Sequence, residues 1–598
     1  MQEPQTFVVS CERISRRQAY YLRFPINDQL IQRLKELPED TRHFNRSMLL
    51  WEVTTTSLLS LIKKYKGSKK IYFDFGSEDT KKIFVDQIRK IEAAEDEKRK
   101  FVADLDIKKE HWVKYKIELE NIYEKYSDQM HALLKEGIKI YPHQIVAAMF
   151  MNVTRNTLIS HEMGLGKSLS SILYVEMNNF KKVVVITPNS LKFNFYGEVD
   201  KFTNSKSHIV KWRKNTCGIE DAKYIILNYD YFNPASADKF KDKWKKLGLD
   251  QIDAVICDES QKLKNTKANT YKNFKSVFTK KIFKNEKISK IFLSGTPAPN
   301  RAHELYTVLN QISPVDFATK KYFNEYYCGM TYDFSNGWGY ITDTAEQKLE
   351  ELYHKIAPYT HRKRKFEVLT DLPDKTYQRI ILEMTPEEQD IYEKIESGVA
   401  NEFVEHPTHN PLTTMIRLRQ YLAQLKVRHV IELIDNILET GEKVVVVDFF
   451  KDSLYELKKQ LGDCMALHTG DQGVEERAEI VKSFQDVNSA TKGFLGSIQT
   501  CNYGLTLTAA SKLFIMTLPY SVGEFDQVSD RLHRIGQKSA VNIYPLIFPD
   551  TIDDYIFSAI EGKRKEIVKV MDNEDYTSNV SESVLSEVIA KIKSKHGK

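Results

Sequence analysis

The sequence predicts an α/β fold with two doubly wound parallel-sheet lobes, a small α+β domain before them and helical insertions between them. Short β-branched runs alternate with helix-length stretches in two parts of the chain, as is typical of parallel sheets covered by helices on both faces. The chain has 598 residues, more than one hydrophobic core usually serves, so several domains are expected. The runs are KKVVVITP (181–188), KYIILNY (223–229), IDAVICDE (252–259) and KIFLSGTP (290–297) in the first lobe, and EKVVVVDFF (442–450), KGFLGSIQT (492–500), SKLFIMTLP (511–519) and AVNIYPLIF (540–548) in the second.

Changes in composition divide the chain into six segments. Residues 1–80 predict the small α+β domain, and the charge-dense residues 81–137 predict a solvated helical connector, because no heptad pattern is sustained there. The other segments are lobe 1 at 138–312, a helical interlobe insertion at 313–440, lobe 2 at 441–572 and a polar tail at 573–598. Within the first domain we expect strands at 20–25, 48–53 and 69–75, and helices at 27–37 and 55–65.

The bulk composition excludes several classes of protein. The 88 basic and 82 acidic residues leave a net charge of only +6, which does not by itself identify a nucleic-acid binder. The six cysteines form no CxxC pair and show no zinc-ligand spacing, so a disulfide framework is not expected. Because no signal-peptide core and no membrane-length apolar run is found, we expect no membrane partner and no secretion. The expected location is the cytoplasm of a bacterium or of a virus-infected cell, or the nucleus in a eukaryote.

The segment HEMGLGKS (161–168) has the composition of a phosphate-binding loop. Glycines such as Gly164 and Gly166 let backbone N–H groups close around phosphates, and the helix that follows favours negative charge at its N-terminus. Lys167 would reach the β- and γ-phosphates, and the Ser168 hydroxyl would take one position on Mg²⁺. A strand-like run precedes the loop and a helical pattern follows it, which is the setting that a phosphate loop needs.

A pair of acids follows an apolar strand at DESQ (258–261). An acid at the carboxyl end of a strand beside a phosphate loop can hold Mg²⁺, and Asp258 has that position. Its neighbour Glu259 can polarise an attacking water. A lone Asp-Glu pair after a strand usually has no function, but here it accompanies the phosphate loop.

Two arginines in QVSDRLHRIGQ (527–537) are spaced to share one face of a helix. Arg531 and Arg534 could extend across an interlobe cleft to the γ-phosphate and stabilise charge in the transition state. The alternative is an ordinary salt-bridged helix, with Asp526 and Asp530 nearby. The presence of the other two motifs favours the first interpretation.

In this order, the motifs resemble those of SWI/SNF-type ATPases of superfamily 2, over about residues 138–565. The resemblance implies two RecA-like lobes that bind ATP and Mg²⁺ between them, with Lys167, Asp258, Glu259, Arg531 and Arg534 as the catalytic set. It also implies nucleotide contacts from Gln144, in IYPHQ, and from Gln537. Further resembling blocks are TPNSLKFNF (187–195), LSGTPAPN (293–300) and NYGLTLTAAS (502–511). The sequence departs from the family pattern at His161, Ser168, Phe195, Gln261 and Thr506.

The N-terminal pattern, with LLWEV as the second arm of a hairpin, is similar to the HARP domain of annealing-helicase relatives, although an unrelated α+β domain fits it equally well. The resemblance implies an ATP-dependent translocase that acts on duplex, forked or branched DNA without sequence preference, as a monomer. Alternatives are a strand-separating helicase and a non-catalytic DNA clamp; no histone-reading module or nuclease motif is found. Among three basic clusters we favour HRKRK (361–365) as a DNA track over KWKK (243–246) and FTKKIFKNEK (278–287).

Overall fold

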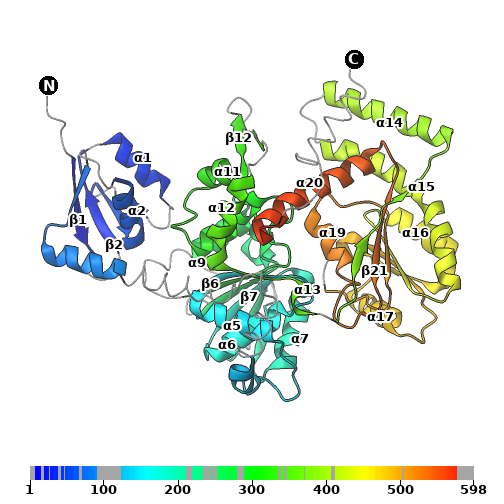
Figure 1. Ribbon diagram of the computed structural model, residues 1–598, viewed down its shortest axis with the longest axis horizontal. Helices are drawn as coiled ribbons and strands as arrows, with labels where there is room; N and C mark the ends of the chain where they lie inside the picture. The colour runs from blue at the N-terminus through cyan, green and yellow to red at the C-terminus, as the bar shows by residue number, and fades with distance from the viewer. Residues whose placement is uncertain are drawn as a thin grey trace.

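The computed structural model places two α/β lobes side by side, with the small N-terminal domain at one end of the molecule (Figure 1). None of the helices in the part of the chain that it describes is both long and apolar enough to cross a membrane. The residues described are 7–14, 19–25, 27–37, 42–45, 48–65, 71–89, 123–210, 219–233, 244, 252–278, 288–333, 338–341, 346–369, 371–405, 411–501 and 504–574. Most of the expected connector, two of the basic clusters (apart from Trp244 and Phe278) and most of the polar tail lie outside these residues.

The N-terminal domain is a five-stranded sheet with strand order β3-β4-β2-β1-β5, and only the β1–β5 pair is parallel. The expected α+β character is confirmed. The strand β1 was not predicted; in it Val9 and Cys11 are buried, while Val8, Ser10 and Glu12 are exposed. The elements are β1 (Phe7–Arg13), β2 (Ala19–Arg23), α1 (Asp28–Glu36), β3 (Arg42–Asn45), β4 (Leu50–Thr54), α2 (Thr55–Tyr65) and β5 (Ile71–Asp74).

Lobe 1 is built on a seven-stranded, all-parallel sheet with strand order β14-β6-β11-β10-β7-β9-β8. Its central strands are apolar up to their last residues because helices cover both faces of the sheet. The strands are β6 (Asn156–His161), β7 (Val183–Thr187), β8 (Ser207–Ile209), β9 (Tyr224–Asn228), β10 (Ala254–Asp258), β11 (Ser289–Leu293) and β14 (Thr360–Lys363). The helices of this half are α5 (Pro142–Thr154), α6 (Lys167–Met177), α7 (Lys192–Phe202), α9 (Asn269–Phe278), α10 (Tyr306–Ile312), α11 (Lys320–Cys328) and α12 (Glu346–Ile356).

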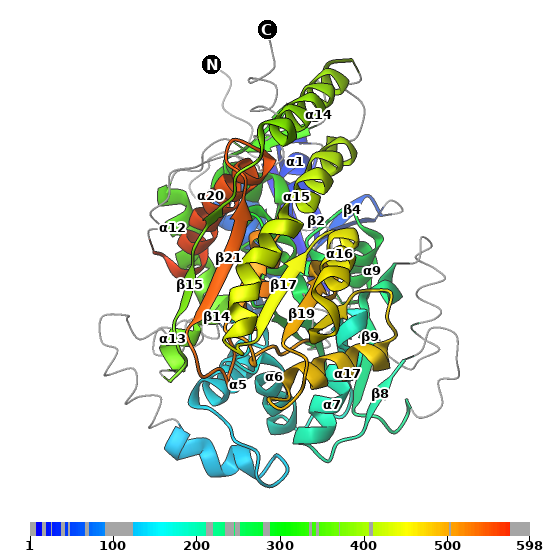
Figure 2. The same cartoon turned by 90° about the vertical axis from the view of Figure 1, so that its right-hand side faces the viewer.

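Lobe 2 has a second parallel sheet, with strand order β15-β21-β20-β17-β19-β18 and β16 also paired with β21. Figure 2 shows α15 lying over one face of this sheet and α14 projecting beyond the strands. The strands are β15 (Lys375–Tyr377), β16 (Ile380–Ile381), β17 (Val444–Asp448), β18 (Met465–His468), β19 (Gly493–Ser497), β20 (Lys512–Ile515) and β21 (Val541–Ile547). The helices are α14 (Pro386–Glu405), α15 (Pro411–Glu439), α16 (Lys451–Leu461), α17 (Val474–Gln485), α18 (Ile498–Cys501), α19 (Val522–Ser529) and α20 (Ile552–Asp572).

The interlobe segment differs from the expected helical insertion. Residues 313–440 also contain a hairpin of β12 (Met330–Asp333) with β13 (Trp338–Ile341), and three strands that complete the two main sheets. Of those three, β14 pairs with β6 of lobe 1, whereas β15 and β16 pair with β21 of lobe 2. The expected boundaries at 313 and 440 are therefore wrong, and the chain passes from lobe 1 to lobe 2 between β14 and β15. The short helix α13 (Lys365–Val368) lies in this crossing.

The last described helix, α20, ties the two lobes together. Its first half contributes Ile552, Ile556 and Ile560 to the core of lobe 2. Its last turns place Val570 and Met571 in a core of lobe 1, where the helix packs on α12. Figure 1 shows α20 reaching from the lobe 2 sheet to lobe 1.

Candidate active site

The glycine-bearing turn after β6 lies at the carboxyl edge of the lobe 1 sheet. Gly164 and Gly166 adopt positive φ angles of 88° and 72°, which favour glycine, and α6 begins at Lys167 immediately after the turn. A Cβ on Gly166 would come within 2.1 Å of Nε2 of Gln144, so a side chain there would displace the glutamine. The turn and helix start form the geometry that cradles phosphates through backbone N–H groups.

The Lys167 side chain lies inside this turn. Its Nζ donates to the backbone oxygen of His161 at 3.0 Å, and a Cβ on Gly295 would lie 3.4 Å from Nζ. Burial lowers the pKa of Lys167, while Glu259 and Asp258 act in the opposite direction. The lysine is therefore positioned between the turn, the acidic pair and the block that begins at Leu293.

Asp258 ends β10, and Glu259 follows it with a left-handed φ of 50°. Thr187 Oγ1 donates to Asp258 Oδ2 at 3.1 Å, which fixes the carboxylate at the sheet edge. Burial and the neighbouring Glu259 raise the pKa of Asp258 to about 7, although Lys167 acts to lower it. A positive φ is uncommon for glutamate, and such conformations cluster at functional sites.

Gln261, one of the departures from the family pattern, connects Glu259 to the next strand. Its Nε2 donates to Glu259 Oε2 at 2.5 Å, and its Oε1 accepts from Ser294 Oγ at 2.7 Å. All three side chains are buried. The amide therefore fixes the direction of the Glu259 carboxylate and relates it to the loop after β11.

Both predicted arginines face lobe 1 across the interlobe boundary. Arg531 Nη2 lies 4.0 Å from Met163 Sδ in the glycine-bearing turn, and Arg534 Cγ would lie 3.6 Å from a Cβ on Gly164. Burial, followed by the repulsion of Arg534, lowers the pKa of Arg531 to about 9, and Glu259 opposes this shift. The structure thus brings the predicted lysine, acids and arginines of both lobes to one place.

Two predicted nucleotide contacts have backbone partners. Gln144 accepts from the backbone N–H of Tyr141 at 2.9 Å and donates to the carbonyl of Leu165 at 3.3 Å. Gln537 donates to the carbonyls of Ala510 and Leu532 and accepts from two further N–H groups. Gln537 therefore holds the turn after Arg534, and the nucleotide contacts of both glutamines stay predictions.

A further acid of this site, Glu198 on α7, was not predicted from the sequence. The Ser168 hydroxyl donates a hydrogen bond to it, whereas its Oε2 is buried and has no hydrogen-bond partner among the described residues. Burial raises the pKa of Glu198, with Ser168 acting in the opposite direction. Only the packing of α7 on α6 brings this acid to the turn, so no spacing rule could have found it.

The oxygen-bearing side chains here fit Mg²⁺. The Ser168 hydroxyl and the carboxylates of Asp258 and Glu198 are hard oxygen ligands, and an unpartnered buried oxygen at Glu198 is suited to a cation or its bound water. Within the described ranges, no three His, Cys, Asp or Glu side chains could hold a metal ion by themselves. That pattern suits a cation held by one or two protein oxygens together with phosphates.

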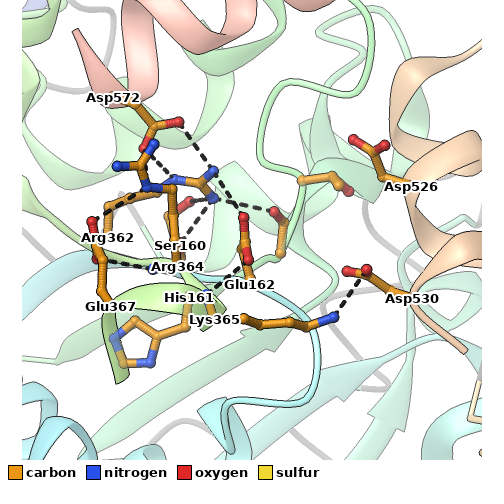
Figure 3. A network of polar contacts seen from close by, with 12 residues as sticks. Ser160, His161, Glu162, Arg362, Arg364, Lys365, Glu367, Asp526, Asp530 and Asp572 are labelled. Atoms are coloured by element: carbon orange, nitrogen blue, oxygen red, sulfur yellow. Dashed lines mark hydrogen bonds and ion pairs between the residues drawn. The ribbon is translucent and has the colours of Figure 1, made fainter. Parts of the chain in front are cut away.

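The cluster HRKRK (361–365) does not form the predicted DNA track. His361, Lys363 and Lys365 are buried, and Figure 3 shows Arg362 and Arg364 turned toward acids of the protein itself. Arg362 Nε pairs with Asp572 Oδ1 at 3.0 Å, and Arg364 Nη1 pairs with Glu574 Oε2 at 2.6 Å. The cluster instead joins the edge of the lobe 1 sheet to the end of α20.

Comparison with known proteins finds two domain families in succession. The SNF2-related domain matches residues 141–427, and the helicase conserved C-terminal domain matches residues 425–536. An uncharacterized ATP-dependent helicase of Mycoplasma genitalium is 26% identical over 445 residues, which are 69% of this chain and 40% of that protein. The DNA annealing helicase and endonuclease ZRANB3 of Homo sapiens is 25% identical over 442 residues, 71% of this chain and 40% of that protein.

The SWI/SNF-related matrix-associated actin-dependent regulator of chromatin subfamily A-like protein 1 of Xenopus laevis is 27% identical over 441 residues, 71% of this chain and 43% of that protein. The chain thus spans less than half the length of these curated relatives. A solved structure, the Sulfolobus solfataricus SWI2/SNF2 ATPase core in complex with dsDNA, is 22% identical and covers 70% of this chain and 90% of its own, with a TM-score of 0.35. From the two matched domains, in the order that its motifs predict, the chain belongs to the SWI/SNF-type family of superfamily 2 helicase-like ATPases.

Proposed function

We propose that this chain is an ATP-driven DNA translocase that remodels forked or branched DNA. The observation that carries the proposal is the position of Arg534 beside Gly164, because its side chain lies against the phosphate loop of lobe 1 and its charge acts on Lys167 in that loop. Cations in this position stabilise the charge that develops on a transferred phosphoryl group. Hydrolysis would therefore depend on the approach of the two lobes.

Each side chain of the site has a task in this scheme. Lys167 and the N-terminus of α6 bind the phosphates, and Glu259, directed by Gln261, takes a proton from the attacking water. Arg531 and Arg534 stabilise the equatorial oxygens in the transition state. Ser168 and Asp258, with Glu198 beside them, would hold Mg²⁺, which neutralises phosphate charge when it is bound.

The loop after β11 provides the coupling between the nucleotide and the relative position of the lobes. Pro299 accepts from the backbone N–H of Gly523 at 3.0 Å and from Ser521 Oγ at 3.2 Å, both on lobe 2. The same loop contains Gly295, where a Cβ would lie 3.4 Å from Lys167 Nζ, and Thr296, which accepts from Gln527 Nε2 at 3.3 Å. A change at the γ-phosphate would therefore reach lobe 2 through one short loop, and the lobes would step along DNA.

The names of the relatives support DNA as the substrate class. One relative is named a DNA annealing helicase and endonuclease, and another a SWI/SNF-related protein. In this proposal the N-terminal α+β domain supplies the preference for a branched DNA structure. We expect the chain to act as a monomer inside the cell and to contact the phosphate backbone, so binding should weaken with salt and show little sequence preference. The alternatives are a strand-separating helicase and a DNA clamp without turnover.

Steady-state ATP hydrolysis tests the proposal, with no DNA, single strand, linear duplex and a model fork, each at two salt concentrations. Strong stimulation by duplex or fork, followed by reannealing of a fork with displaced strands, is the expected result. Stimulation by single strand alone, with unwinding of a tailed duplex against a trap strand, would favour the helicase. Absence of hydrolysis under every condition would leave the clamp.

A further inference from the structure

Lys365 lies in the crossing between the lobes and contacts both halves of the candidate active site. Its backbone N–H donates to Glu162 Oε2, in the glycine-bearing turn, at 2.9 Å. Its Nζ donates to the carbonyl of His533 at 2.5 Å and pairs with Asp530 Oδ1 at 2.9 Å, both on lobe 2. The residue is only 3% exposed, and Figure 3 shows its side chain extended from the Glu162 side toward Asp530.

A second lysine of the same crossing holds the same carboxylate. Lys375, the first residue of β15, has its Nζ 2.8 Å from Asp530 Oδ1. Burial alone would raise the pKa of Asp530, but Lys365 and Lys375 hold it well below its usual range. A third contact fixes the neighbouring turn, since His533 Nε2 lies 2.7 Å from the carbonyl of Pro373. The crossing therefore contacts the arginine-bearing turn of lobe 2 at two residues, Asp530 and His533.

Asp530 is directly connected to the arginines. It precedes Arg531 in the chain, and its backbone oxygen accepts from Arg534 Nε at 3.1 Å. The charged groups of Lys365 and Lys375 both lie against the buried carboxylate of Asp530. A buried charge that loses its partner is strongly destabilising, so this group holds its members in one arrangement. Moving Asp530 would move Arg534 away from Gly164.

We propose that Lys365, assisted by Lys375, is a positioning residue that sets Arg534 against the phosphate loop through Asp530. The inference rests on the proposed function, since it assigns a role in ATP hydrolysis. It gives the basic segment 361–365 a different task from DNA binding: the segment fixes the register between the turn of lobe 1 and the arginines of lobe 2. Neither lysine touches the nucleotide in this scheme.

The test compares Lys365→Met, which removes the charge, and Lys365→Arg, which keeps it, with Lys394→Met on the exposed face of α14 as the matched control. The kcat and KM for ATP are measured with fork DNA. Fluorescent ADP and a fluorescent non-hydrolysable ATP analogue report binding without turnover. Circular dichroism reports folding, and Lys375→Met, which leaves one cation on Asp530, replaces Lys365→Met if that variant does not fold.

We expect Lys365→Met to lower kcat by about tenfold or more and to lower the preference for the ATP analogue over ADP by about tenfold, while ADP affinity stays within about threefold. Lys365→Arg should recover most of the kcat and most of the preference for the ATP analogue, and Lys394→Met should match the parent in both quantities. Unchanged kcat and preference, an equal loss of ADP affinity, or no recovery in a folded Lys365→Arg would overturn the inference. If the parent hydrolyses no ATP with any DNA, the proposed function fails, and the nucleotide preference still tests the role of Lys365.

Discussion

His161 Nε2 lies 2.7 Å from His361 Nδ1, and this contact joins the strand that leads into the glycine-bearing turn to the added strand β14. Both rings are buried, and the ring of His143 lies edge-on to His161 with centroids 5.6 Å apart. Burial, with the neighbouring cations and histidines, lowers the pKa of both residues well below the usual value. Two buried histidines therefore meet beside the strand that leads into the glycine-bearing turn.

This pair predicts a loss of stability in mild acid. A histidine whose pKa is lowered by folding contributes its full stability above the unfolded pKa of about 6.5, and loses it as the pH falls below that value. His361→Asn should reduce the fall in unfolding free energy between pH 6.5 and 5.5 by about 1 kcal/mol. Urea midpoints at the two pH values measure the effect. His354→Asn, at an exposed position of α12, is the control, and an equal change in both variants would contradict the prediction.

Lys167→Ala should lower ATP hydrolysis by at least about 100-fold, because the phosphates lose their main side-chain cation. The fold should survive, since Lys167 Nζ contacts backbone oxygens that water can satisfy. Hydrolysis rates and the thermal midpoint measure the two effects. Ser168→Thr, which keeps the hydroxyl, should remain active. Retained turnover in Lys167→Ala would remove the assignment of the turn as the phosphate site.

Gln261→Ala should lower kcat by about tenfold and change ATP affinity by less than about threefold. Without the amide, Glu259 loses the donor that directs it, while the phosphate-binding groups stay in place. Single-turnover hydrolysis and nucleotide titration separate the two quantities. Gln460→Ala on the surface of α16 is a matched control. Equal losses of binding and turnover in Gln261→Ala would mean that the site as a whole is disturbed.

Glu566→Ala should release the docking of α20 on lobe 1. Glu566 accepts from Arg301 Nη1 at 3.1 Å and from the backbone N–H of Ala302 at 2.8 Å, and its loss leaves both donors buried. The expected cost is about 3 kcal/mol, visible as a lower thermal midpoint and faster proteolysis within α20. Glu479→Ala on α17 removes an exposed acid as the control. Identical midpoints for the two variants would show that the contact does not hold the helix.

The parallel sheets could be predicted because their central strands are apolar except at their last residues. Val183–Thr187 and Val444–Asp448 are buried along their whole length, so their sequence pattern is continuous. The strand β14 was missed because its sequence, THRK, is polar; its side chains are neutralised by partners that lie far away in the chain. A prediction from sequence pattern does not include such ion pairs, because the ion pairs form only through tertiary packing.

The site shows the same limit. Lys167, Asp258 and the arginines follow local patterns, because strands and turns with fixed spacing present them. Glu198 and Lys365 reach the site only through the packing of α7 and through the crossing between the lobes. A lysine in a basic run has the sequence pattern of a surface cation. The acid that Lys365 pairs with, Asp530, lies 165 residues later in the chain (530 minus 365), so no local pattern reveals the pair.

The place of β14 in the lobe 1 sheet decides where this enzyme can be divided. A fragment ending at residue 312 would lack β14 and leave β6, the strand that carries the phosphate loop, as an unpaired edge. Exposed, apolar edge strands pair with other chains and aggregate. Isolated lobe 1 should therefore be produced as a fragment that extends through α13, and insertions or fusions belong outside the span from β6 to β15.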